Sequence, residues 1–263
     1  MNDPEITKTT PKLNQALKMG FRAAYDSLGY VVFSSFALFF VCSVFFAAVL
    51  LVSRVAGTFG LLLVVPGLFV GWMGMVGIFY YVRKVIYHQR PTPAVTLIGM
   101  RVLLGPALAL FVVDIIAGVL LVGDVVFFAL AFQSKGGVVY AALAILFAYM
   151  GLMWLLMGLY HAPLLVDQLE HDSGPRLKKI LYKSFLLTAD NPAFTVGLFV
   201  VIIALTILCA MPALMGIALL LPAVAAFLLT FSLRELYIKY GIVEPEPEVI
   251  EDKPWTLGGQ SRD

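Results

Sequence analysis

Long stretches without a charged residue alternate with short polar and basic segments along this chain. The first two, residues 27–53 and 55–82, hold 27 and 28 uncharged residues and are separated by Arg54. A helix needs about 20 residues to cross the hydrocarbon core of a bilayer, so each stretch is long enough to cross once. The pattern predicts two helices joined by a short turn at "SRVAGTFG".

The later stretches extend this pattern to six spans. Residues 102–134 are interrupted only by Asp114 and Asp124, and residues 136–166 contain one ionisable group, His161. Residues 191–233 carry no charge at all and would form a straight helix about 64 Å long, twice the thickness of a bilayer core. We expect this stretch to reverse near Pro212, which lacks a backbone donor and disfavours helical geometry just before it. The predicted spans are 27–53, 55–82, 102–134, 136–166, 192–210 and 214–233.

Composition supports the same fold class. Hydrophobic residues make up 61% of the chain and charged residues 13%, about half the charged share of a soluble domain, and the mean hydropathy is +0.96. The uncharged stretches are too long and too uniformly apolar for barrel strands. We therefore expect an all-α, polytopic integral membrane protein, with the lipid bilayer as its main partner and no nucleic-acid partner.

Basic residues predict the orientation. If there are six spans, sixteen Lys and Arg residues fall on the side of the two termini, and only Arg54 and Lys135 fall on the other. Basic loops stay in the cytoplasm, so both termini are expected to be cytoplasmic and the protein to lie in the inner (plasma) membrane.

Each pair of spans is preceded by a similar segment and followed by a similar exit. The exits "FYYVRKVIY", "LYHAPLLVDQ" and "LRELYIKYG" place Tyr81, Tyr160 and Tyr237 roughly 80 residues apart. Such spacing is typical of internal repeats. We expect three helical hairpins, each preceded by a cytoplasmic interfacial amphipathic helix, in units of about 12–86, 92–168 and 175–241. The segment that precedes the third span resembles the other two least. We expect its helix to break at Gly105-Pro106.

Amphipathic periodicity is the basis for the interfacial helices. The first sets Leu13, Leu17, Phe21 and Ala24 against basic residues, and the third sets Leu177, Ile180, Leu181 and Ser184 against Lys178, Lys179 and Tyr182. Lysines on such a helix would contact anionic headgroups; a basic loop that obeys the orientation rule alone is the alternative. The expected headgroup contacts are Lys18, Arg22, Arg176, Lys178, Lys179 and Lys183.

Polar segments flank the membrane domain, which we place at residues 12–241. Residues 1–11 lack the pattern of a removable signal peptide, and residues 242–263 alternate Glu with Pro, so both segments are expected to be disordered and cytoplasmic. Trp255 within the acidic tail could act as a docking motif, although a solvated tail is the simpler interpretation.

Soluble-enzyme signatures are missing from the sequence. We find no P-loop, no H-E-x-x-H and no G-x-S-x-G, and Cys42 and Cys209 both fall in apolar stretches, where cysteine behaves as a small hydrophobe. We expect no catalysis, no cofactor, no metal and no disulfide. An intramembrane lipid enzyme would have only His161, Asp167, Glu170 and His171 to use.

Intramembrane ionisable groups are the remaining candidates for chemistry, because they are costly in lipid and usually face a cavity or a partner. Asp114 lies about ten residues inside the third span and is either a proton or cation site or a structural group hydrogen-bonded to a neighbour. Asp124 lies near the outer end of the same span, where we expect water to hydrate its carboxylate. His161, at the inner boundary, either makes a local hydrogen bond or joins a proton or substrate site.

Small and aromatic residues in the spans have packing roles as their simplest interpretation. Gly67, Gly71, Gly74 and Gly77 follow helical spacing and permit close contact within the molecule or with a second copy. Trp72 and Trp154 are interpreted as packing residues.

The segments "VVPGLFVGWMGMVGIFYYVRKVI", "LYHAPLLVDQ" and "LKKILYKSFLLTADNPAFTVGLFVVIIALTIL", the last leading to "RELYIKYG", resemble the YesL family of bacterial six-helix membrane proteins. The likeness covers most of residues 16–241. The family is often encoded near carbohydrate uptake systems, so the resemblance implies an accessory role there, with an ABC-type sugar permease or another membrane protein as partner. It supplies no catalytic residues.

Two functions therefore follow as hypotheses. The first is a non-catalytic membrane protein that assists or regulates solute uptake, with carbohydrate as the expected solute. The alternative is a small-solute or proton-coupled transporter that uses Asp114.

Overall fold

The computed structural model describes residues 10–87, 91–171, 174–211 and 215–244, and all secondary structure in these ranges is helical. Most of the expected disordered ends, residues 1–9 and 245–263, and the expected reversal at Pro212 lie outside the described residues. The elements are α1 (Leu13–Asp26), α2 (Leu28–Ala56), the 3-10 helix η1 (Gly57–Leu63), α3 (Val64–Ile86), α4 (Ala94–Lys135), α5 (Val138–His171), α6 (Leu177–Asp190), α7 (Pro192–Ala210), α8 (Met215–Leu219) and α9 (Leu221–Lys239).

Six helices in the described ranges are long and apolar enough to cross a membrane, which confirms the predicted multi-pass membrane protein. They are α2, η1 with α3, α4, α5, α7 and α9. The sixth span differs from its predicted bounds: the short helix α8 precedes it, and α9 continues to Lys239 instead of ending at Leu233.

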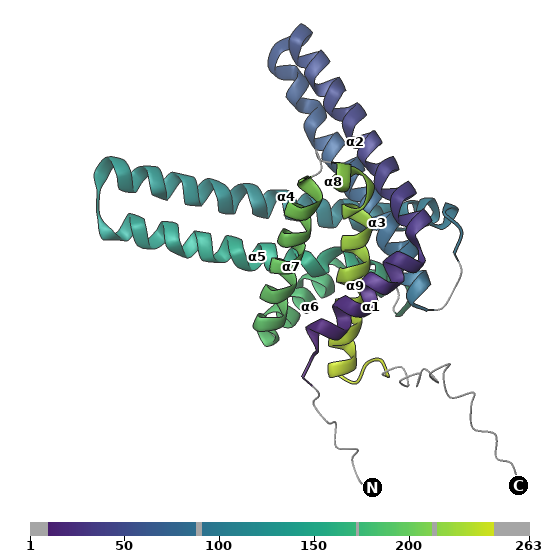
Figure 1. The fold of residues 1–263 in the computed structure, drawn as a ribbon. Helices are drawn as coiled ribbons and strands as arrows, with labels where there is room; N and C mark the ends of the chain where they lie inside the picture. The colour runs from purple at the N-terminus through teal and green to yellow at the C-terminus, as the bar shows by residue number, and fades with distance from the viewer. Residues whose placement is uncertain (1–9, 88–90, 172–173, 212–214, 245–263) are drawn as a thin grey trace, which may run out of the picture.

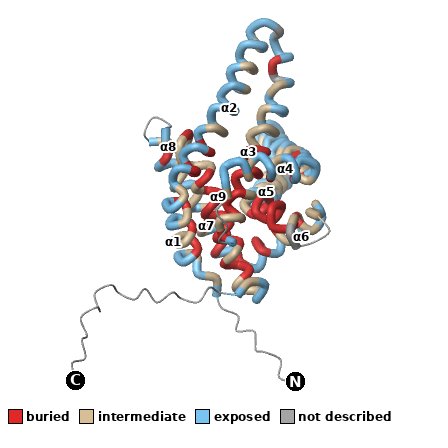
Figure 2. The backbone as a smooth tube through the Cα atoms, turned by 90° about the vertical axis from the view of Figure 1, so that its right-hand side faces the viewer, coloured by how far each residue is buried: buried red, intermediate tan, exposed pale blue. Residues whose placement is uncertain are grey.

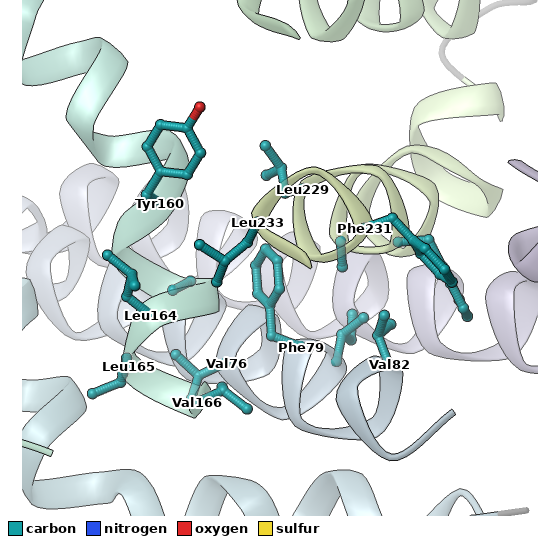
Figure 3. Close-up of a cluster of buried hydrophobic side chains, with 14 of the residues drawn as sticks. Val76, Phe79, Val82, Tyr160, Leu164, Leu165, Val166, Leu229, Phe231 and Leu233 are labelled. Atoms are coloured by element: carbon teal, nitrogen blue, oxygen red, sulfur yellow. The ribbon is translucent and has the colours of Figure 1, made fainter. Parts of the chain in front are cut away.

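The packed core lies at one end of the molecule, where α3, α5 and α9 meet (Figures 1 and 3). Leu233 of α9 lies beside Phe79 of α3 there (Figure 3). In α9, 61% of the most apolar stretch is buried, against none in α4. The last span in the sequence is therefore the central helix of the fold.

Two pairs of helices project from this core in different directions (Figure 1). One consists of α2 and α3, joined by η1, and the other of α4 and α5, joined at Gly136. Their distant halves are exposed and consist largely of Val, Leu, Ile and Phe, as Figure 2 shows for α2 and α3. An isolated helix satisfies its own backbone groups in lipid, so these halves need only lipid around their side chains.

The expected break at Gly105-Pro106 is wrong, because α4 continues through Pro106 as one helix from Ala94 to Lys135. Proline removes one backbone bond from a helix, but membrane helices tolerate this where local adjustment satisfies the freed carbonyl. The segment before the third span is therefore the first part of α4 and not a separate helix.

Helix α1 buries a face that overlaps the predicted one: Ala24 is buried and Leu13 and Leu17 pack against the core, but the face is shifted toward the small residues. Ala16, Gly20 and Ala24 are its buried residues, and α1 packs on α9, with Gly20 against Leu228. Phe21, which the periodicity assigned to the apolar face, is 44% exposed. Small residues allow the two helix backbones to approach closely, and this close contact outweighs burial of the larger ring. In α6, Ile180 and Ser184 are buried while Lys178 and Tyr182 are exposed.

The glycine stripe of α3 serves contacts within the molecule. A Cβ on Gly67, Gly71 or Gly74 would meet Phe45, Cys42 or Leu38 of α2, each within 3.2 Å or closer. Gly77 faces α4 instead, where a Cβ would lie 2.8 Å from the carbonyl oxygen of Thr96.

We expect Gly77→Ala to destabilise the protein by about 1 to 3 kcal/mol, because the backbone of α4 must move to admit the methyl group. Gly158→Ala in α5 is the matched control, since no atom lies within 4 Å of its Cβ position and alanine favours the helix. The check is SDS-induced unfolding of the purified variants in mixed micelles. Equal stability of the two variants would contradict the close contact of α3 and α4.

Candidate functional site

The two residues named from the sequence as a proton or substrate site lie together in the structure. Nδ1 of His161, on α5, is 3.0 Å from Oδ1 of Asp114, on α4. The His161 side chain is 0% exposed and that of Asp114 is 26% exposed. The long antiparallel contact between α4 and α5 brings them together although 47 positions separate them in the sequence.

The Asp114–His161 pair is close enough for an ion pair but lacks the alignment of a hydrogen bond. Neither ring nitrogen of His161 has a hydrogen-bond partner among the described residues, and neither has Oδ1 of Asp114. Trp154 meets the imidazole edge to face, with ring centroids 5.6 Å apart. A buried polar group without a partner is costly, so the pair is an unfavourable arrangement for packing alone.

A groove of about 970 Å³ between α2, α3 and α4 reaches Asp114. Its walls are apolar and partly aromatic, with Phe45, Trp72 and Phe111 among the lining residues. The indole N–H of Trp72 donates to the carbonyl of Ala107 at 3.3 Å, so this ring ties α3 to α4 beside the groove. Trp72 and Trp154 both make packing contacts, as expected, and both lie near the Asp114–His161 pair.

A second polar cluster, which the sequence analysis did not find, lies where α3, α5 and α9 end. The Arg83 guanidinium is 3.2 Å from Asp167 Oδ1 and donates to the carbonyl of Val166 at 3.1 Å. The Tyr237 hydroxyl donates to Asp167 Oδ2 at 2.8 Å. Arg83 and Asp167 are both buried, and a cavity of about 130 Å³ adjoins the cluster. The sequence did hold a signal for this cluster, because Arg83 and Asp167 carry opposite charges at corresponding exits of two spans.

A third cluster joins α6, α7 and α9 near the surface. Lys239 Nζ donates to Asp190 at 3.1 Å and to Asn191 at 2.6 Å. The Tyr240 hydroxyl donates to Asp190 and accepts a bond from Asn191. Burial, and then the bond to Asp190, raise the pKa of Tyr240 above its ordinary value. The cluster fixes the start of α7 beside the end of α9.

The other residues singled out in the sequence are spread over the molecule. Asp124 is half-buried on α4 and has no ion pair in the described part of the chain. The side chains of Glu170 and His171 lie outside the described part of the structure, where Trp255 also lies. No group of three or more His, Cys, Asp or Glu side chains that could hold a metal occurs among the described residues. Of the expected headgroup contacts, Lys18, Arg22, Arg176 and Lys178 are exposed, while Lys179 and Lys183 are half-buried.

Comparison with known proteins gives no relative of this chain: no family model, no curated protein and no solved structure matches it.

Proposed function

We propose that the six spans cross the inner (plasma) membrane with both termini in the cytoplasm. The strong excess of Lys and Arg in segments on the side of the termini supports this orientation. The described ends of the chain leave the same end of the helical core (Figure 1), as an even number of crossings requires.

The three-unit organisation is also part of this proposal, with the boundaries predicted from the sequence. The matching exits of α3, α5 and α9 supply Arg83, Asp167 and Tyr237, which meet in one cluster. Helices α1 and α6 each have 14 residues and precede a span directly, as interfacial helices would. In the second unit, the corresponding segment is continuous with its span.

For the biochemical function, we propose a proton-coupled membrane transporter of small solutes. One observation carries this proposal: a carboxylate and an imidazole lie 3.0 Å apart inside the membrane-spanning part, with unsatisfied polar atoms and an open groove beside them. Ionisable groups within apolar spans are costly and mark ion or proton pathways, and histidine is the side chain best suited to exchange protons near neutral pH.

The accessory role in carbohydrate uptake follows from the YesL resemblance alone. No arrangement of side chains in the described structure favours it over the proton site, so it stays a prediction. Affinity capture of the intact protein in mild detergent tests it, because an accessory protein would retain a permease.

The test of the transporter uses purified full-length protein in liposomes that contain a pH-sensitive dye. Uncharged sugars, organic anions and organic cations are added one class at a time. At least one class is expected to drive proton movement in the wild type and none in Asp114→Asn, while Asp124→Asn, a carboxylate change elsewhere on α4, behaves as wild type.

Two results would remove this function. One is a wild type that moves no protons with any class of solute. The other is Asp114→Asn moving protons as fast as the wild type, since the carboxylate would then have no part in the coupling.

A further inference from the structure

The groove beside Asp114 has a composition that selects among solutes. Among the described residues that line it, Asp114 is the one charged side chain, and the other walls are aliphatic, aromatic, glycine or, at Cys42 and Met75, sulfur-containing. Its volume of about 970 Å³ falls within the range of pockets that hold drug-sized molecules. Phe46 and Leu68 of its lining are exposed at the protein surface, so the groove opens toward the surrounding lipid.

Charge and hydrogen bonding exclude most solutes from this groove. A sugar would lose the water around each hydroxyl and find few partners in the walls, which is costly. An organic anion would be repelled by the Asp114 carboxylate and would find no Lys or Arg among the described residues that line the groove. An organic cation would gain both from the carboxylate and from the ring faces of aromatic side chains such as Phe45, Phe111 and Trp72.

We infer that the groove between α2, α3 and α4 binds a lipophilic organic cation, which takes the place of the proton on the Asp114–His161 pair. This inference rests on the proposed proton site and names the class of its solute. The cation is bulky and apolar, because the walls are, and carries one positive charge for the one carboxylate.

The exchange balances in charge and in protons. Before binding, the pair holds one proton and has no net charge, whichever of the two groups carries the proton. After binding, the ligand cation neutralises the Asp114 carboxylate, His161 is neutral, and one proton has left to water. Two positive charges beside one carboxylate repel each other strongly in a dry interior, so the proton and the cation exclude one another.

The other charged groups on the helices around the pair lie near helix ends or on α6. Cys42 of α2 lines the groove, and α7 carries no charged residue. The charged residues of α3 and α9 are confined to the final turns, Arg83 and Lys84 in α3 and Arg234, Glu235 and Lys239 in α9. Helix α6, which contacts both α4 and α5, carries the charged residues Lys178, Lys179, Lys183 and Asp190. Asp114 and His161 are therefore the groups expected to set the pH dependence.

The experiment measures binding of tetraphenylphosphonium to purified full-length protein in nanodiscs by calorimetry. Tetraphenylborate, an anion of nearly the same size and shape, is the matched probe. Tetraphenylphosphonium is expected to bind with one proton released, so that its apparent affinity falls tenfold for each unit of decreasing pH while the pair holds a proton. Tetraphenylborate is expected to bind at least 100-fold more weakly.

Variants identify the carboxylate as the binding group. Asp114→Asn should lose at least 100-fold in cation affinity and show no proton release, and Asp124→Asn should bind as wild type. Asp114→Glu keeps a carboxylate and should retain binding with a shifted pH dependence, which covers the case in which Asp114→Asn fails to fold. His161→Gln should bind the cation with a weaker dependence on pH.

The inference fails if the two probes bind equally or if Asp114→Asn binds as wild type, because either result means apolar adsorption only. Infrared titration of the Asp114 carboxyl and the His161 imidazole in the same samples separates this failure from that of the proposed function. A pair in which either group titrates without cation binding overturns the solute class and leaves the proton site standing. A pair in which neither group titrates overturns both.

Discussion

Arg83→Met is expected to destabilise the protein by about 3 to 5 kcal/mol, because it leaves the buried Asp167 carboxylate without its cation. Methionine fills much of the space of the arginine stem and can neither pair with Asp167 nor donate to the carbonyl of Val166. The three helices that form the core, α3, α5 and α9, all contribute to this cluster. SDS-induced unfolding in mixed micelles measures the change.

Arg101→Met is the control, since it removes the same side chain from an exposed position on α4 and should change stability by less than about 0.5 kcal/mol. Adding Asp167→Asn to Arg83→Met removes the uncompensated charge and should recover part of the loss. If the two arginine variants unfold at the same SDS fraction, the ion pair has no structural role.

Leu228→Ala is expected to cost about 2 to 5 kcal/mol, the usual range for truncating a buried leucine. Leu228 is 0% exposed in α9 and lies against Gly20 of α1, so the truncation leaves a cavity between the central helix and the N-terminal helix. Packing is the main source of stability between helices in a membrane, since lipid already solvates apolar side chains.

Leu155→Ala separates two causes of the stability loss, the lost packing contacts and the lost hydrophobic side chain. Leu155 is 53% exposed on α5, so lipid fills the space that the truncated side chain leaves and the cost should stay below about 0.5 kcal/mol. Both variants are compared by SDS-induced unfolding. A similar loss at both positions would mean that Leu228 is not in a packed core.

The number of membrane helices could be predicted from the sequence, because it depends on the length of uncharged stretches alone. Residues 191–233 show this most clearly: their length required a reversal, and the structure has α7 and α9 as two separate spans. Helix ends were less predictable, because charge does not mark them. Arg54 lies within α2, and α9 extends past Arg234 and Glu235 to Lys239. Glu235 accepts a bond from the backbone N–H of Lys12 there, and Lys239 pairs with Asp190.

Contacts between helices could not be predicted from periodicity. The burial of Ala16 and Gly20, which the periodicity did not place on the apolar face, depends on the approach of α9, which lies about 200 positions later in the sequence. The continuity of α4 through Pro106 likewise depends on surroundings and not on local preference.

Part of the candidate site could be predicted and part could not. Asp114 and His161 were each identifiable as costly charges inside apolar stretches. Their pairing required the register of α4 against α5, which the sequence does not encode in any local pattern. Arg83 was interpreted only as a basic residue of an inner loop, so its partnership with Asp167 was missed.

The central position of α9 has a consequence for biosynthesis. The ribosome delivers this helix after every other span, so Arg83 and Asp167 enter the bilayer before Tyr237 exists. At ordinary elongation rates, roughly 10 to 30 seconds pass between emergence of α3 and completion of α9. A ribosome that stalls before residue 221 therefore leaves a membrane fragment without its organising helix.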